Sequence, residues 1–332
     1  MSCSSRLCAV LLLALPAASA AAVQIKFATL APEGTDAMRL MREADAEVRA
    51  KTKGELSFKF YPGGRLGDET DMVRKIELGQ LQAGGFTGVG LGEIAPEVRI
   101  LDAPWLFRDT KEVDRITSAF AKEFEQAFEA KGFVLLGWTE VGFVRVFSKA
   151  PVRSAADMRR LKLWAWEGDP IAGAAFKALG VHPIPLSITD VNTSLETGLI
   201  DAVYAAPLYA IALQWNEKTK SVFSLPLANA SGAVLLSKKA FDALPEDQRR
   251  ILLAACAPRL RKLTETTRRE NAAAMETLKK QGMTMTSVSP PQEETLFEEA
   301  GRKARLELVG RLYSADFLAR VEKALAEFRS KK

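Results

Sequence analysis

The sequence is poor in the residues that enzymes and metal proteins most often use for chemistry. It has one histidine, His182, and three cysteines in 332 residues. His182 lies between Val181 and Pro183 in a connection before an expected strand, a position typical of a surface loop. So few ligands and nucleophiles cannot form a histidine-rich metal site, a Ser/His/Asp triad or a Cys/His pair. We therefore expect no catalytic residue, no metal and no cofactor.

Long apolar runs are missing as well, except near the beginning of the chain. Arg6 precedes an apolar run from Ala9 to Ala17, and small residues follow it. A run of about ten residues is half of what a transmembrane helix needs, and it is typical of a secretory signal peptide. We expect residues 1–22 to be this signal, cleaved after Ala20 or Ala22, and the mature protein to lie in the periplasm.

Removal of such a signal would also remove two of the three cysteines. Cys3 and Cys8 lie within it, so only Cys256 would remain and no internal disulfide could form. Core burial must then stabilise the mature chain, whose length exceeds one hydrophobic core and indicates two lobes. The net charge of +5 does not indicate a nucleic-acid partner, because basic and acidic residues alternate throughout.

Apolar periodicity predicts an α/β fold. Residues 24–30 and 56–61 alternate as strands, residues 36–53 and 68–78 repeat at helical spacing, and residues 83–92 form a strand that leads into a loop. This alternation favours a largely parallel sheet flanked by helices. A helix over 111–131 follows, and then two strands that cross between the lobes, 133–138 and 143–148.

A second α/β unit follows the crossing strands. It has a strand at 162–166, a helix at 170–179, a helix near 187–197 and a short strand at 201–204. Residues 245–281 form a long helix that Pro258 should kink or interrupt, because proline lacks an amide donor. We expect a first lobe of residues 23–142 with 232–257, and a second lobe of 143–231 with 258–332. Two hinged lobes are typical of a protein that closes on a ligand.

Several motifs resemble those of the solute-binding proteins of tripartite ATP-independent periplasmic (TRAP) transporters, the DctP family. They keep the order and spacing of that family along most of the mature chain. They are Tyr61–Glu69, Leu101–Phe107, Phe176–Gly180, Leu195–Asp201 and Ser237–Lys239 with Leu244–Pro245. The resemblance implies a two-lobed periplasmic-binding-protein fold with a long helix spanning both lobes. It also implies a ligand in the cleft and delivery to a membrane permease driven by an ion gradient.

The chain departs from the family at the residues that bind organic acids. The family's anchoring arginine corresponds to Trp164, and indole offers one donor and an apolar face instead of a bidentate fork. A second position at which many family members have an arginine corresponds to Val144, and Arg145 lies one residue further along. A shift of one residue turns a strand side chain to the other face, unless a deletion restores the register.

These departures predict an apolar cleft. The candidate ligand-binding residues are Trp164, Trp166, Tyr204, Trp138, Val144, Arg145, Leu208 and Glu33. Each tryptophan can instead fill a lobe core, and Trp215 can likewise lie in a core or in the pocket. Tyr209 can lie at the mouth of the cleft or on a helix surface. A solvated loop carboxylate remains the plain interpretation of Glu33.

The first ligand hypothesis is an apolar or weakly polar solute. The alternative keeps the family's organic acid, held through Arg145 or backbone amides. A third hypothesis is a secreted enzyme or binding scaffold that reuses the fold. The resemblance to a subgroup with an apolar pocket implies a further partner, a periplasmic tetratricopeptide-repeat protein.

Overall fold

The structure is a computed structural model, and it describes residues 22–290 and 293–331. The predicted signal peptide therefore lies outside the described residues, apart from residue 22. Among the described helices, none is long and apolar enough to cross a bilayer.

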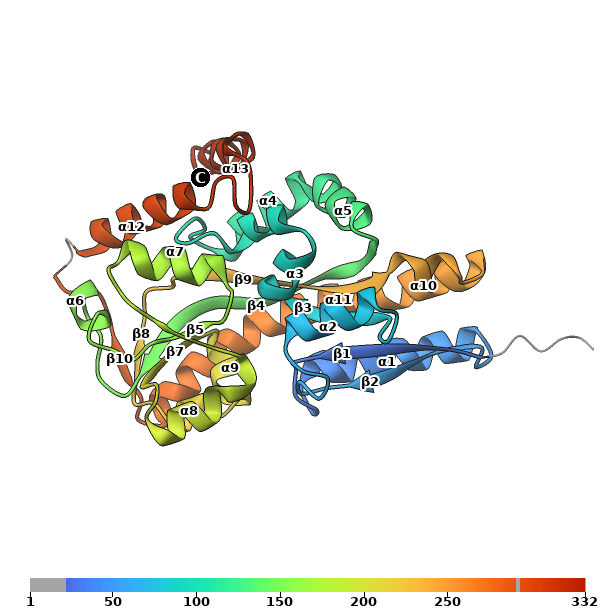
Figure 1. Cartoon of the computed structure of the whole chain (residues 1–332), viewed down its shortest axis with the longest axis horizontal. Coiled ribbons are helices and arrows are strands. Elements are labelled where there is room, and N and C mark those ends of the chain that lie inside the picture. Colours follow the sequence, from blue (N-terminus) through green and yellow to red (C-terminus); the bar gives the residue numbers. More distant parts are fainter. Residues whose placement is uncertain (1–21, 291–292, 332) are drawn as a thin grey trace, which may run out of the picture.

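A mixed sheet of eight strands forms the centre of the molecule (Figure 1). The strands β1 (Val23–Thr29), β2 (Leu56–Tyr61) and β3 (Ala83–Thr87) run parallel, with β1 in the middle. Two longer strands, β9 (Ala228–Ser237) and β4 (Phe133–Ser148), then join antiparallel. The sheet is thus parallel at the β1 side, as predicted, and antiparallel where it passes toward the second lobe.

The second lobe continues the sheet from the carboxyl-terminal half of β4. That half pairs with β7 (Ala202–Ala205) and β8 (Ser221–Phe223), and β8 pairs with β10 (Thr284–Thr286). A separate parallel pair consists of β5 (Trp164–Trp166) and β6 (Ile184–Leu186).

One prediction about the crossing strands was wrong, because β4 is continuous where two strands were expected. Irregularities in its register with β9 fall between Leu135 and Gly137 and between Glu140 and Gly142. Gly142 has a φ of 110°, which favours glycine. The bulges absorb the extra residues that made the sequence look interrupted.

Helices cover the sheet in both lobes. In the first lobe they are α1 (Asp36–Lys51), α2 (Glu69–Glu77), α3 (Gly88–Ile94), the 3₁₀ segment η1 (Pro96–Asp102), α4 (Thr110–Ala119), α5 (Ala121–Ala130) and α10 (Lys238–Asp242). The second lobe adds α6 (Ala155–Met158), α7 (Pro170–Ala178), the 3₁₀ segment η2 (Ile188–Asp190), α8 (Val191–Thr197), α9 (Pro207–Ala212) and the 3₁₀ segment η3 (Trp215–Glu217). The single helix expected over 111–131 is divided at Phe120.

The long helix α11 (Glu246–Lys280) spans both lobes, as predicted (Figure 1). It packs against α1 and β4 and, further along, against α9. Its 35 residues correspond to a length of about 50 Å. Pro258 lies inside it, and the helix continues past this residue instead of ending there.

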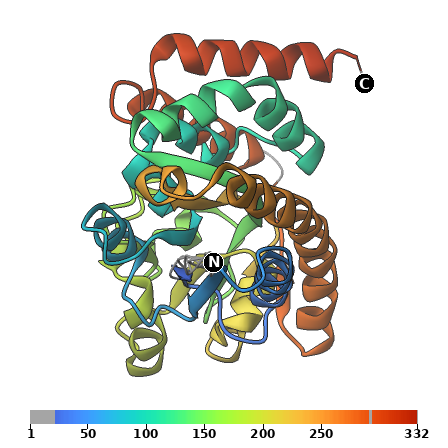
Figure 2. The same cartoon turned by 90° about the vertical axis from the view of Figure 1, so that its right-hand side faces the viewer.

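The chain ends in α12 (Glu293–Glu307), which packs on α7, and α13 (Ala315–Arg329), which packs on α4. Figure 2 shows α13 beside the green helices of the first lobe, although the predicted division placed it in the second. The other predicted lobe boundaries stay predictions, since β4, β9 and α11 pass through them without interruption.

The crossing of β4 and α11 leaves no room for a side chain at one position. A Cβ atom on Gly137 would lie 2.8 Å from Leu260 Cδ1 and 3.1 Å from Leu260 Cβ. We expect Gly137→Ala to lower the free energy of unfolding by about 1–3 kcal/mol, because the packed helix must shift. Urea unfolding of the mature chain measures this.

The matched control is Gly173→Ala in α7, where a new Cβ would meet nothing within 4 Å. It should be neutral or stabilising by about 0.5–1 kcal/mol, because alanine favours helix over glycine. Equal unfolding midpoints for the two variants would contradict the close packing of β4 on α11.

Candidate functional site

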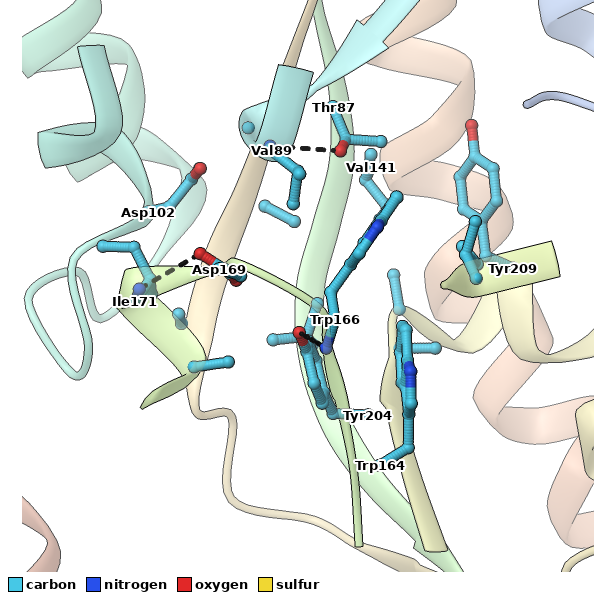
Figure 3. A pocket seen from close by; sticks show the side chains of 18 of the residues that line it. Thr87, Val89, Asp102, Val141, Trp164, Trp166, Asp169, Ile171, Tyr204 and Tyr209 are labelled. Atoms are coloured by element: carbon cyan, nitrogen blue, oxygen red, sulfur yellow. Dashed lines mark hydrogen bonds between the residues drawn. The ribbon is translucent and has the colours of Figure 1, made fainter. Parts of the chain in front are cut away.

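A cavity of about 360 Å³ lies between the lobes. The β3–α3 junction and η1 form its wall on the first lobe, and β5, β7, α7 and α9 form its wall on the second. Residues of the crossing strands, among them Val141, Val144, Ala228 and Asn229, line it as well. The volume is within the range that small-molecule sites have. Figure 3 shows side chains from both lobes directed toward this space.

Aromatic side chains form the second-lobe wall. The rings of Trp164 and Tyr204 stack with centroids 4.9 Å apart and planes 19° apart, and Trp215 meets Trp164 edge-on at 5.4 Å. Trp164 is 1% exposed, and its Nε1 donates to the Leu186 carbonyl at 3.0 Å. Because this donor is already used inside the lobe, Trp164 can offer a ligand only apolar surface.

Trp166 contacts a carboxylate of the opposite lobe. Its Nε1 donates to the Asp68 carboxylate at 3.0 and 3.1 Å, and Ser187 Oγ donates to the same group at 2.6 Å. The Ile188 amide adds a contact at 3.3 Å. Asp68 is also the N-cap of α2 in a capping box. The start of α2 is therefore tied to β5 and to the loop that follows β6.

A buried ion cluster lines the cavity near the start of α7. Arg99 Nη2 lies 2.8 Å from Asp169 Oδ1, and Arg99 Nε lies 3.0 Å from Asp102 Oδ2. The three side chains are 4–6% exposed. Among the described lining residues these three are the charged ones. The cluster has one cation and two carboxylates, so no positive charge is left unbalanced.

Burial and charge act in opposite directions on this cluster. Burial works against the charged form of Arg99, yet Asp169 and Asp102 keep its pKa above the ordinary value. Burial raises the pKa of Asp102, although Arg99 and Ser231 oppose the rise. The guanidinium therefore stays protonated, and the buried Asp102 is a weaker acid than an ordinary aspartate.

Four of the predicted site residues line the cavity. They are Trp164, Trp166, Tyr204 and Val144. Trp164 and Trp166 share a face of β5, as strand alternation requires. Tyr204 accepts a hydrogen bond from the Trp166 amide at 3.4 Å. Their contact with a ligand stays a prediction. Tyr209 and Trp215, for which two locations were open, also line the cavity.

The location expected for Trp138 was wrong. Its ring packs against Phe124 and Phe128 of α5, with centroids 5.7 and 5.9 Å away, in the first-lobe core. Trp138 is on the face of β4 that α5 covers. Strand alternation cannot tell whether the face of β4 that carries Trp138 meets the cavity or a helix. The position of α5 decides this.

Arg145, the alternative anchor for an acid, does not lie at the cavity. Its Nε donates to the Ser224 carbonyl at 3.1 Å and its Nη1 to the Phe143 carbonyl at 3.2 Å, away from the cavity lining. Val144 lines the cavity instead, which agrees with alternation along β4. Arg145 therefore does not line the cavity in this structure, and its role as an anchor for an acid stays an untested prediction.

Two further candidates lie outside the cavity lining. Glu33 pairs with Arg42 at 2.7 Å, and both side chains are about half exposed. Leu208 is half-buried, and its amide donates to Asn271 Oδ1 at 3.0 Å, while Tyr209 beside it faces the cavity. His182 is exposed, as expected for a loop residue.

Sequence reasoning missed Asp68, Arg99, Asp102 and Asp169. Asp68 had a local signal, because an acidic residue three positions later completes a capping box. Asp169 precedes Pro170 at the start of α7, which is a helix-start signal and not a sign of a ligand site. Arg99 had no signal at all. Within the described ranges no cluster of three His, Cys, Asp or Glu side chains could hold a metal ion.

Comparison with known proteins gives a family and a fold. Bacterial extracellular solute-binding protein family 7 (DctP) matches residues 27–306. The chain is 30% identical over 211 residues to the 2,3-diketo-L-gulonate-binding periplasmic protein YiaO of Escherichia coli, covering 63% of this chain and 64% of that protein. It is 24% identical over 310 residues to the C4-dicarboxylate-binding periplasmic protein DctP of Rhodobacter capsulatus, covering 92% of each.

A solved structure agrees with this fold. A TRAP periplasmic solute binding protein from Ralstonia eutropha H16, with bound (S)-2-acetolactate, superposes with a TM-score of 0.85 at 21% identity. The match covers 92% of this chain and 99% of that one. The two-lobed α/β fold expected from the sequence is thereby confirmed.

Next to the cavity, Glu69 is a buried carboxyl with an unusual pKa. It accepts from the Thr87 amide at 2.7 Å, Thr87 Oγ1 at 2.9 Å and the Gly90 amide at 2.7 Å. Burial nevertheless raises its pKa to about 7. Between pH 4.5 and 7 the folded chain holds a proton that the unfolded chain has lost. This group should therefore lower the stability by about 3 kcal/mol as pH rises through that range.

Glu69→Gln should remove this pH dependence, because an amide does not titrate. The amide also places a donor against the Gly90 N–H, so the variant should be less stable at every pH. The readout is therefore the slope of the free energy of unfolding against pH. Urea unfolding at several pH values measures it. Glu77→Gln, on the exposed face of the same helix, should keep the wild-type slope. An unchanged slope in Glu69→Gln would show that Glu69 has an ordinary pKa.

Proposed function

Because the chain belongs to family 7 of the bacterial extracellular solute-binding proteins (DctP), we propose that it captures a small organic acid with an apolar body in the cavity between its lobes. It would then deliver this solute to a TRAP membrane permease. The observation that carries the proposal is a cavity that two lobes enclose and whose wall includes a buried arginine, Arg99.

The comparisons support the acid part of the proposal. YiaO and DctP are named for a diketo sugar acid and for C4-dicarboxylates, and the Ralstonia protein holds a hydroxy-oxo acid. They favour the organic-acid alternative over the apolar solute that the sequence suggested first. The proposed anchor is Arg99 and not Arg145, because Arg99 is the cation among the described residues that line the cavity. A guanidinium can bind a carboxylate through two parallel hydrogen bonds.

The lining of the cavity supports the apolar body. Trp166, Tyr204 and Ile171 present rings and aliphatic groups to the space, and the almost fully buried Trp164 and Phe176 pack against Tyr204. Apolar ligand surface that leaves water here would contribute about 25 cal/mol per Å². A polyhydroxylated sugar acid needs a hydrogen-bonding partner for each hydroxyl, and this wall offers few.

A second candidate ligand is an uncharged apolar solute. It is favoured by the pairing of Arg99, whose charge already faces two carboxylates. An uncharged solute is also favoured by Trp164, which stands where we expect the family to have an arginine and leaves β5 without a cation. An acid would have to compete for Arg99, whereas an uncharged solute would not.

The remaining predictions about location and partners rest on the family. Family members named above are periplasmic proteins, and export through a cleaved signal within residues 1–22 is the route we propose. A tetratricopeptide-repeat partner stays a prediction from the subgroup resemblance.

Matched pairs of ligands test the proposal. Hexanoate with hexanamide, and 3-phenylpropanoate with its amide, have nearly equal shapes and differ in charge. The mature chain should be unfolded, freed of any carried ligand, refolded and titrated calorimetrically with each. We expect the acid of a pair to bind at least about tenfold tighter than its amide, because a charge-assisted hydrogen bond replaces a neutral one. Equal or tighter binding of the amides would favour the uncharged solute.

A further inference from the structure

Asp169 brings a carboxylate of the second lobe to the arginine of the first lobe. It caps the amino end of α7, where its Oδ1 accepts from the Ile171 amide at 3.0 Å. The same oxygen accepts from Arg99 Nη2 at 2.8 Å, across 70 positions of sequence. Both side chains are at most 5% exposed and both line the cavity. Figure 3 shows Asp169 beside the Ile171 amide that it caps.

The other carboxylate of the cluster is held differently. Asp102 lies three residues after Arg99 in the same segment, η1, and its Oδ1 accepts from the Ser231 amide at 2.7 Å. Asp102 therefore stays with Arg99 whatever the second lobe does. Arg99 Nε, although 3.0 Å from Asp102, has no well-formed hydrogen bond. Asp102 is a fixed counter-charge, while Asp169 reaches Arg99 only when the lobes are together.

The position of Asp169 is the position that an acidic ligand would need. A ligand carboxylate at the second-lobe wall would have to reach the Nη2 edge of Arg99, and the chain's own carboxylate is already there. Nearby, Tyr204 has its pKa raised by burial first and by Asp169 second, so its hydroxyl keeps its proton. The surroundings of Arg99 thus resemble an acid-binding site already filled by an internal acid.

We propose that Asp169 is a specificity-determining residue, an internal carboxylate that occupies Arg99 in the closed protein and that an acidic ligand must displace. The inference rests on the proposed function only in assuming that the cavity binds the solute. It predicts that acids bind by exchange for Asp169, so that wild type loses part of the affinity that their charge would otherwise contribute. Uncharged solutes bind without this exchange.

Asp169→Asn tests the inference directly. Asparagine keeps the size of the side chain and remains a good N-cap for α7, but it removes the charge that competes for Arg99. We expect hexanoate and 3-phenylpropanoate to bind at least about tenfold tighter to this variant than to wild type, because one partner of a buried charge pair is removed. The affinity for the matching amides should stay within about twofold.

The matched control is Asp109→Asn. Asp109 is also a helix N-cap, accepting from the Glu112 amide at 2.9 Å at the start of α4, and it does not line the cavity. The Asp109→Asn substitution removes the same charge from the same kind of position, and it should leave both acid and amide binding unchanged. If Asp169→Asn does not fold, as judged by circular dichroism and a cooperative melt, Asp169→Ser provides a smaller uncharged cap.

The outcomes separate this inference from the proposed function. Tighter acid binding to Asp169→Asn than to wild type supports the inference. If the variant binds acids and wild type binds none, the inference is supported and the organic-acid proposal is overturned in favour of the uncharged solute. Acid binding that is equal in wild type and Asp169→Asn overturns the inference and leaves the proposed function in place. No acid binding to either protein overturns both.

Discussion

The backbone ladder between β4 and β9 is the constraint on which the rest of the structure depends. It runs from the pair Phe133–Ser237 in the first lobe to the pair Val144–Ala228 in the second. Residues near its second-lobe end, including Val144 and Asn229, line the cavity. Because each hydrogen bond of a ladder fixes its neighbours, this part of the site is rigid, and α11 braces it from one side.

Polar contacts between the walls of the cavity, partly buried at Asp68 and fully buried at Arg99, are the second determinant of the site. Asp68 accepts from Trp166 and Ser187, and Arg99 meets Asp169. A buried charge without a partner is costly, whereas in water each of these groups would be solvated. The contacts therefore act less as a source of stability than as a restriction on how the lobes meet. They place the aromatic wall of β5 and β7 opposite the glycine-containing start of α3.

Trp164 limits what β5 can contribute to this site. The indole is stacked on Tyr204 and its nitrogen is bound inside the lobe, so β5 supplies shape and apolar area only. The cation of the site comes instead from η1 of the opposite lobe, with two carboxylates beside it. Under the proposed function, selectivity for charge is thereby separated from the apolar surface that would hold the body of the ligand.

The sequence by itself determined the features that depend on local periodicity and capping. These are the α/β alternation, the long helix α11, the shared face of Trp164 and Trp166, and the start of α2 at Asp68. Only the tertiary structure decided which face of a strand meets the cavity. In it Trp138 packs against α5, and Arg145 donates to backbone carbonyls. The tertiary structure also paired Arg99 with Asp169, which no spacing could reveal. Local patterns encode the direction of a side chain relative to its own element, whereas the partner it meets depends on how distant elements pack.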